Sequence, residues 1–321
     1  MLHLNKLNFN YGKLKTSKET KEKLKIISEK FEYYCNQIFD LKSNGENNNN
    51  NNNDDLVIVE LKKNFIKNIL CYDKLSIDFC KSILNDYNKN AYLGMDNPNM
   101  MIHLPDDIME EGRFHYDQTG SDEIVTIWTP ITDYNYDALA YYKVGALIYK
   151  FFKILKIEKF LPKKNITVNK FESIEWSGYF IHKGCLNTSK NISSAIVVGL
   201  RFSKEDNSNL IYEDFTEDSI YYNYKITLEF INNLINYSKN KNISTKEKFE
   251  YVEKKLKSMK FSINQVIVAK IFSVVAQRLH RNSEIQNNFE NLSFLIDMSS
   301  YFLDKNNYSS LTRLKKTDFF N

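Results

Sequence analysis

Residues 100–202 contain short β-type segments separated by polar turns. The segments rich in Ile, Val, Thr and aromatic residues are 124–131, 166–171, 177–181 and 194–202. Residues of these types favour strands. Only one helical pattern, at 144–155, interrupts them, whereas a doubly wound parallel sheet needs a helix between each strand and the next. This stretch therefore predicts an antiparallel sandwich or barrel.

Helical patterns lie on both sides of the β segments. Residues 17–43 and Ser76–Tyr87 carry apolar side chains at three- and four-residue spacing. Further along, Ser244 to Glu247 forms a capping-box pattern, and additional apolar helices are expected from Ser262 and over 289–303. The predicted fold class is α+β, with a β core, N-terminal helices and an all-helical C-terminal extension.

These patterns divide the chain into three regions. The predicted regions are 1–55 with a helix and an Asn-rich loop, 56–205 with the β core, and 206–321 with the C-terminal helices. The tract Asn47–Asn53 has nothing to bury and is expected to be a solvated loop, and Leu56–Val59 is expected to form a short strand.

The C-terminal helices are expected to pack on the core. The junction 203–208 is short and lacks Pro and Gly, unlike a flexible linker. Residues 263–279 are too apolar to face water, so they must be covered by the core or by a second copy of the chain. A homodimer formed through the C-terminal helices is therefore a possible assembly.

Charge and composition argue against several classes of function. Lys+Arg 44 against Asp+Glu 40 gives a net charge of +4, which does not indicate duplex binding. No apolar run reaches the length of a signal peptide or a membrane span, so we expect a cytoplasmic protein without nucleic-acid or membrane partners. The four cysteines, Cys35, Cys71, Cys80 and Cys185, show no paired spacing and are expected to be reduced thiols. Motifs for acyl or phosphoryl transfer are missing.

Three residues are of the types that bind metals in proteins. His115 and Asp117 are two positions apart, so on an extended segment their side chains point to the same side. His182 ends a later strand-like segment that begins at Trp176. Two His and one carboxylate on one side of a barrel, with other coordination positions open, form the ligand set of non-haem Fe(II) oxygenases.

The residues around this set give it a wider context. After His115-x-Asp117 come a W-x-P motif at Trp128–Pro130, an H-x-x-x-x-N motif at His182–Asn187, and a strand closing on Arg201-Phe202. This arrangement resembles the phytanoyl-CoA dioxygenase-like branch of the Fe(II)/2-oxoglutarate-dependent oxygenases. The resemblance covers about residues 100–203 and neither helical flank.

The resemblance implies a fold, a ligand set and two cofactors. The fold would be a double-stranded β-helix of the jelly-roll or cupin type within 56–205. His115, Asp117 and His182 would be the iron ligands and the catalytic centre. Fe(II) and 2-oxoglutarate would be the cofactors, and the reaction would hydroxylate a small organic substrate.

The expected contacts of 2-oxoglutarate in this chain are Thr126 and Arg201. The family usually has an Arg ten or eleven residues after the distal His, where it pairs with the far carboxylate of 2-oxoglutarate. Residues 191–194 read N-I-S-S here and contain no Arg. Arg201 matches a later, strand-closing Arg of the family, roughly 20 Å further along the strand at about 3.3 Å per residue. Lys190 or a lysine of another strand is the alternative contact, although an ammonium offers a point charge in place of a two-pronged donor.

Other interpretations of the same residues stay open at this point. The chain could be a catalytically inactive oxygenase-like barrel that works as a binding or scaffold protein, or an O2-using metal enzyme without 2-oxoglutarate. His115 could also be a barrel-end imidazole bonded only to Asp117. Trp128, Trp176 and His103 are expected to be core residues.

Overall fold

The protein is described here from a computed structural model. The described residues are 11–39, 52–87, 90–94, 98–105, 113–118, 123–202, 211–240, 243–286 and 289–315. By its internal contacts the chain divides into two compact units. The first comprises Met1–Glu32 and Lys74–Tyr212, and the second Tyr33–Asp73 and Glu213–Asn321. Residues 56–73 thus group with the C-terminal helices, and not with the β core to which the sequence assigned them.

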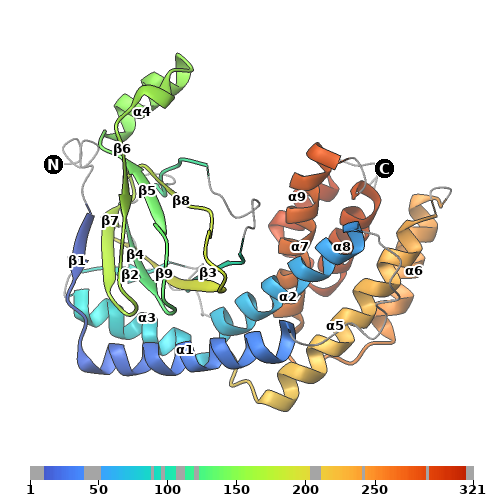
Figure 1. The fold of residues 1–321 in the computed structure, drawn as a ribbon. Coiled ribbons are helices and arrows are strands. Elements are labelled where there is room, and N and C mark those ends of the chain that lie inside the picture. Colours follow the sequence, from blue (N-terminus) through green and yellow to red (C-terminus); the bar gives the residue numbers. More distant parts are fainter. Residues whose placement is uncertain are drawn as a thin grey trace. The chain divides into compact units, whose positions relative to one another are not determined.

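The first unit contains two antiparallel sheets (Figure 1). The larger sheet has the order β1-β7-β4-β9-β2, and β3 also pairs with β9. Its strands are β1 (Tyr11–Leu14), β2 (Tyr92–Leu93), β3 (Asn99–His103), β4 (Ile124–Pro130), β7 (Ser173–Ser177) and β9 (Ser193–Arg201). The smaller sheet, in the order β6-β5-β8, consists of β5 (Leu139–Tyr142), β6 (Lys163–Ile166) and β8 (His182–Gly184). The predicted α+β class with an antiparallel β core is confirmed.

The two sheets pack face to face through a shared apolar core. Alternate residues of each strand point inward, so Trp128 of β4 and Trp176 of β7 meet Leu139 and Tyr141 of β5 in one buried cluster. Both tryptophans are buried, as predicted. The interior of the sandwich is therefore dominated by aromatic rings, and the candidate site forms at its edge.

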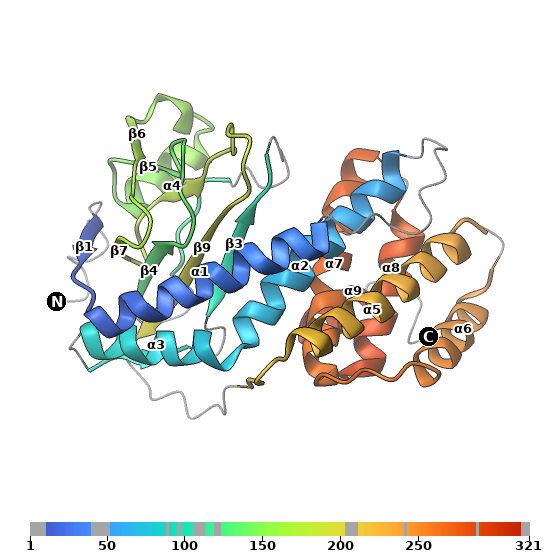
Figure 2. The same ribbon diagram turned by 60° about the horizontal axis from the view of Figure 1, so that its bottom comes forward.

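Helices α1 (Lys18–Phe39) and α3 (Lys74–Tyr87) run side by side along the larger sheet (Figures 1 and 2). Ser28 of α1 donates to the carbonyl of Ile131 at 2.6 Å, just beyond β4. On the side of the sheet opposite Trp128, Ile127 and Val198 are almost fully buried. Both helices agree with the sequence prediction.

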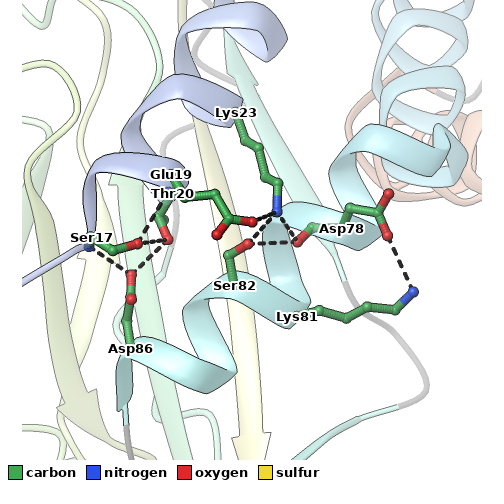
Figure 3. Close-up of polar contacts among 8 residues, drawn as sticks. All are labelled: Ser17, Glu19, Thr20, Lys23, Asp78, Lys81, Ser82 and Asp86. Atoms are coloured by element: carbon green, nitrogen blue, oxygen red, sulfur yellow. Dashed lines mark hydrogen bonds and ion pairs between the residues drawn. The ribbon is translucent and has the colours of Figure 1, made fainter.

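Polar contacts join α1 to α3 (Figure 3). Asp86 accepts from Thr20 Oγ1 at 2.6 Å and from the backbone N–H of Ser17 at 2.9 Å, which caps the start of α1. Lys23 bridges the two helices by donating to Glu19 at 2.6 Å and to Ser82 at 2.5 Å. These contacts hold the two helices in register on the sheet.

Two predicted strands are wrong in their limits. The segment predicted at 177–181 is a strand only up to Ser177, because Phe180 N–H donates to the Ser177 carbonyl and the chain turns. The segment predicted at 166–171 ends as a strand at Ile166, and Phe171 adopts a left-handed backbone with φ 67°. Predicted strands 124–131 and 194–202 are confirmed as β4 and β9, and the predicted helical insert is confirmed as α4 (Ala146–Ile154).

The second unit, apart from the end of α1, is built from the helices α2 (Asn52–Tyr72), α5 (Glu217–Ser238), α6 (Thr245–Lys257), α7 (Gln265–Gln286), α8 (Glu290–Leu303) and α9 (Tyr308–Leu314). The predicted capping box of Ser244 and Glu247 is present at the start of α6. In α7, the apolar residues at 267–279 are buried apart from the partly exposed Val274, and α2 and α8 pack against this helix. The apolar segment is thus covered by helices of its own unit.

The predicted strand at Leu56–Val59 is wrong. These residues lie inside α2, where Val57, Leu61 and Phe65 are buried at four-residue spacing. A short apolar run fits either a strand or one turn of a buried helix, and packing against α7 selects the helix here. Asn52 and Asn53 begin α2, and the rest of the Asn tract lies outside the described residues.

None of the four cysteines takes part in a disulfide in the part of the chain that the structure describes. Among the described residues, no helix combines the length and the apolar character needed to cross a membrane.

Candidate metal centre

The two candidate histidines lie directly opposite each other on adjacent extended segments. The His115 N–H donates to the His182 carbonyl at 2.9 Å, and the His182 N–H donates back to the His115 carbonyl at 3.0 Å. Residues paired in this way have side chains on the same side of the ladder. Accordingly, the two ring centroids are 4.5 Å apart. The backbone thus brings together two imidazoles that are far apart in the sequence.

Asp117 completes the group. It lies two residues after His115 on the extended segment and points to the same side. Its Oδ1 atom is 3.5 Å from His115 Nε2 and 3.8 Å from His182 Nε2. One candidate ligand atom from each of the three residues lies within 4.8 Å of the others. The predicted convergence of His115, Asp117 and His182 is therefore present.

Backbone carbonyls orient both imidazoles. His115 Nδ1 is 2.8 Å from the carbonyl of Arg113, and His182 Nδ1 is 3.1 Å from the carbonyl of Phe180. A carbonyl oxygen can only accept, so each Nδ1 carries the proton and each neutral ring keeps the lone pair of Nε2. This hydrogen bond to the remote nitrogen is the usual support of a metal-ligating histidine.

Two donors from the larger sheet hold the other oxygen of Asp117. Thr126 Oγ1 of β4 donates to Oδ2 at 2.6 Å, and Trp176 Nε1 of β7 donates to the same oxygen at 3.1 Å. Thr126 and Trp176 are paired across β4 and β7, so the sheet itself sets their spacing. Oδ2 is engaged by the protein, and Oδ1 is left facing the two imidazoles.

The three candidate ligands differ in burial. The His115 side chain is 53% exposed, whereas that of His182 is only 8% exposed. The ring of His182 lies between Trp176, at a centroid distance of 4.9 Å, and Phe180, at 5.9 Å. The site is therefore open on the His115 side and closed by aromatic rings on the His182 side.

The electrostatics of the site favour an ionised carboxylate. Burial raises the pKa of Asp117, but a hydrogen bond from the protonated form of His115, attraction to the protonated form of His182 and the bonds from Thr126 and Trp176 together hold it well below its usual value. The bond with Asp117 raises the pKa of His115 above 6.5 despite its partial burial. For His182, burial lowers the pKa, and Asp117 offsets this only in part.

A close backbone approach supports the ligand-bearing segment. Gln118 N–H donates to the Gly178 carbonyl at 2.8 Å, and the Gly178 N–H donates to the Ile124 carbonyl at 2.7 Å. A Cβ at Gly178 would lie 2.9 Å from Gln118 Oε1 and 3.2 Å from the Ile124 carbonyl oxygen. The segment carrying His115 and Asp117 is thus held against the sheet so closely that a Cβ at Gly178 would displace the Gln118 side chain or β4.

The two residues expected to contact 2-oxoglutarate occupy different places. Thr126 contacts Asp117, as described above. Arg201 ends β9 opposite Ile124, and Gly199 lies opposite Thr126. Because side chains alternate along a strand, Arg201 is on the same face of the sheet as Thr126, one inward-facing pair further along.

The position at which the family places its Arg is occupied by a neutral residue. Ser193, eleven residues after His182, starts β9 and is fully buried. Trp128 Nε1 and Tyr134 Oη are buried in the same unit without a hydrogen-bond partner among the described residues. His103 is buried, as predicted, with its ring 6.2 Å from that of Tyr134. Burial raises the pKa of Tyr134, and the neighbouring Tyr136 raises it further.

Sequence reasoning missed the support given by Trp176 and Gln118. Trp176 was expected only to fill the core, yet its indole N–H is a hydrogen-bond donor to Asp117. A buried Trp usually finds an acceptor for that N–H, and this was the one available signal. Its partner could not be identified from the sequence because the two residues are 59 positions apart.

Comparisons with known proteins give only distant likenesses. No family model matches the chain, and no curated protein matches it. Among solved structures, it is similar to SnoK, a non-haem alpha-ketoglutarate-dependent carbocyclase from nogalamycin biosynthesis, with 15% identity and a TM-score of 0.28 over 32% of this chain and 48% of that one. The chain therefore spans about half the length of SnoK.

Two other solved structures cover more of the chain. AviO1 from Streptomyces viridochromogenes shares 10% identity over 62% of this chain and 92% of its own, with a TM-score of 0.39. ThoJ, a non-haem monooxygenase in complex with nickel, shares 9% identity over 66% of this chain and 86% of its own, with a TM-score of 0.35. The three convergent side chains, and not these partial likenesses, are the basis for a function.

Proposed function

We propose that the chain is a non-haem Fe(II) oxygenase that uses 2-oxoglutarate to hydroxylate a small organic substrate. The observation that carries this proposal is the arrangement of His115 Nε2, His182 Nε2 and Asp117 Oδ1, which face one another from one side of the site. Two His and one carboxylate leave further positions open on a metal, as oxygen chemistry requires. We also propose that the two packed sheets form the double-stranded β-helix of such enzymes.

The ligand set fits a divalent metal of this type. Metal–ligand bonds of about 2.1 Å at right angles place ligand atoms about 3 Å apart. The 3.5 Å and 3.8 Å separations from Asp117 need to close by less than about 1 Å, and the three ligand atoms, which lie within 4.8 Å of one another, by less than about 2 Å. Changes of side-chain torsion supply movements of this size. The donor set of two imidazoles and one carboxylate suits iron, and the protonated Nδ1 atoms already present Nε2 to the centre.

Bound iron would activate O2, with 2-oxoglutarate oxidised to succinate and CO2 while one oxygen atom enters a C–H bond of the substrate. The residues of the chain hold the metal ligands in position and shield one side of the site from water. Thr126 and Trp176 keep Asp117 as a ligand through one oxygen, and the rings of Trp176 and Phe180 exclude water behind His182. The exposed edge of His115 leaves the substrate side open.

We assign the far carboxylate of 2-oxoglutarate to Arg201. A buried carboxylate needs a cation, and Ser193 does not provide one at the usual position. Arg201 supports the assignment because it shares the inward face with Thr126, and its guanidinium offers a two-pronged donor. Arg201→Gln should weaken 2-oxoglutarate binding by at least about tenfold and leave Fe(II) affinity unchanged. Loss of both affinities together would instead indicate a structural role.

Anaerobic titration tests the function directly. Purified protein is mixed with Fe(II) and then with 2-oxoglutarate, and the weak visible charge-transfer band of the iron chelate is recorded. We expect a band with the native chain and with Asp137→Ala, in which an exposed carboxylate remote from the ligand set is removed. We expect none with Asp117→Ala, because one of three ligands is lost. Unchanged Fe(II) affinity in Asp117→Ala would exclude this residue as a ligand.

A second candidate is a metal-binding barrel that does not use 2-oxoglutarate, either as an O2-using enzyme or as a binding protein. Its support is Ser193 in the place of the family's Arg. Tight Fe(II) binding without a chelate band at saturating 2-oxoglutarate would favour it. Oxygen uptake by the Fe(II)-loaded protein would then separate the enzyme from the binding protein.

A further inference from the structure

Helix α4 and the turn that follows it expose an unusual amount of apolar surface. We call residues 143–164 the α4 finger. Thirteen large hydrophobic side chains are exposed among the described residues, and six of them lie in this finger. These six are Leu147, Ile148, Phe151, Ile154, Leu155 and Phe160. Figure 1 shows α4 extending beyond the ends of β5 and β6, away from the two sheets.

The exposed residues form one face of the helix. Leu147, Phe151 and Ile154 follow each other at four- and three-residue spacing, and Ile154 is 78% exposed. The opposite face anchors the helix, because Tyr149 is buried and its hydroxyl donates to the Phe114 carbonyl at 3.0 Å. The fold therefore needs the Tyr149 face and does not use the apolar face.

The finger is also strongly basic. Its sequence has seven lysines and a single acidic residue, Glu158, whereas the whole chain has a net charge of only +4. The rest of the chain is thus slightly negative. Lys143 and Lys164 lie side by side, and the contact with Lys164 lowers the pKa of the exposed Lys143 ammonium. Such a concentration of like charge favours an anionic partner.

We propose that the α4 finger binds the surface of an anionic lipid bilayer. Large apolar side chains on one face of a helix, surrounded by lysines, are the composition of helices that lie in the membrane interface. The apolar face would enter the boundary between headgroups and acyl chains, and the lysines would contact lipid phosphates. With nine residues, α4 has a length of about 14 Å, so it would lie on the bilayer and not span it.

Charge argues against a symmetric dimer through this surface. A symmetric dimer through the finger would place two strongly positive surfaces against each other, which costs free energy unless anions intervene. The predicted absence of a membrane partner rests on the lack of an apolar run as long as a signal peptide or a membrane span, and a short amphipathic helix has no such run. The proposal is independent of the metal centre and does not rest on the proposed function.

Co-sedimentation of the full chain with vesicles tests the proposal. We expect little binding to phosphatidylcholine vesicles and clear binding to equimolar phosphatidylcholine and phosphatidylserine, weakened by added salt. Lys153→Gln with Lys159→Gln should reduce binding about thirtyfold. Phe151→Ser with Ile154→Ser should reduce it by at least about tenfold.

Matched variants control for general effects. Lys18→Gln with Lys25→Gln removes two exposed lysines of α1, and Ile26→Ser removes an exposed apolar side chain of the same helix. These variants should bind like the native chain. Equal losses in the controls, or no binding to phosphatidylserine vesicles, would overturn the proposal. Binding to polyglutamate without binding to vesicles, or a dimer that Phe151→Ser dissociates in sedimentation velocity, would assign the finger to a protein partner instead.

Discussion

The hydrogen bond from Trp176 to Asp117 offers a sharp test of the candidate metal centre. Trp176→Phe removes the indole N–H and keeps an aromatic ring in the core. The lost bond is 3.1 Å long, which is long for a bond to a carboxylate, while the 2.6 Å bond from Thr126 to the same oxygen remains. Hydrogen bonds to charged groups contribute about 1.5–3 kcal/mol, so we take the lower end of that range.

About 1.5 kcal/mol corresponds to roughly tenfold weaker metal binding, provided that the bond orients Asp117 only in the ligating geometry. Mutation of groups that hydrogen-bond metal ligands typically lowers metal affinity by at least about tenfold. The assay is anaerobic titration with Mn(II), in which the free ion is followed by electron paramagnetic resonance. Thr126→Val, which removes the shorter bond, should lower the affinity at least as much.

Trp128→Phe is the matched control. Trp128 is as deeply buried as Trp176, and its Nε1 has no hydrogen-bond partner among the described residues. Both substitutions leave a small cavity and should lower the free energy of unfolding by about 1–3 kcal/mol. Only Trp176→Phe should weaken Mn(II) binding. Native-like affinity in Trp176→Phe, or an equal loss in Trp128→Phe, would refute the assigned role of the indole N–H.

Three further outcomes follow from the geometry. Metal affinity should fall as the pH drops through the raised pKa of His115, above 6.5, because a proton then occupies the ligating nitrogen. Mn(II) titrations at several pH values measure this affinity, and an affinity that does not change with pH would contradict the prediction. Gly178→Ala should lower the free energy of unfolding by about 1–3 kcal/mol in urea titrations, because its Cβ would lie 2.9 Å from Gln118 Oε1. An unchanged free energy of unfolding would show that the Gln118 side chain and the surrounding backbone move aside without strain. Arg313→Gln should lower the free energy of unfolding by about 3–5 kcal/mol in the same measurement, because Arg313 donates to both oxygens of buried Asp297, at 2.6 and 2.8 Å. A decrease below about 1 kcal/mol, the size found for surface ion pairs, would mean that water reaches this pair.

Much of the candidate site could be predicted from the sequence because its signals are local. The spacing of His115 and Asp117 on an extended segment places both side chains on one side, whatever the rest of the fold does. The capping box at Ser244 and Glu247 is local in the same way, because its two hydrogen bonds form within one helical turn. Periodicity over many residues likewise predicted α1, α3 and α8.

Short apolar runs did not distinguish a strand from a buried helical turn and did not define where a strand ends. Leu56–Val59 has the composition of a strand, but the buried positions Val57 and Leu61 belong to a helix that packs on α7. In β7 the strand stops at Ser177, because the chain turns there to bring His182 opposite His115. Tertiary contacts set these limits, and no local pattern specifies them.

Which groups can bind a metal follows from the residue types, since the chemistry of two imidazoles and a carboxylate belongs to the side chains. How those groups are held depends on contacts between segments that are far apart in the chain. Cross-strand pairing sets His182 opposite His115, and β4 and β7 bring Thr126 and Trp176 to one oxygen of Asp117. The same holds for the α4 finger, whose apolar residues look like core residues in the sequence. Their exposure was decided by which face of the helix Tyr149 anchors, because burial depends on what packs against a residue and not on the residue alone.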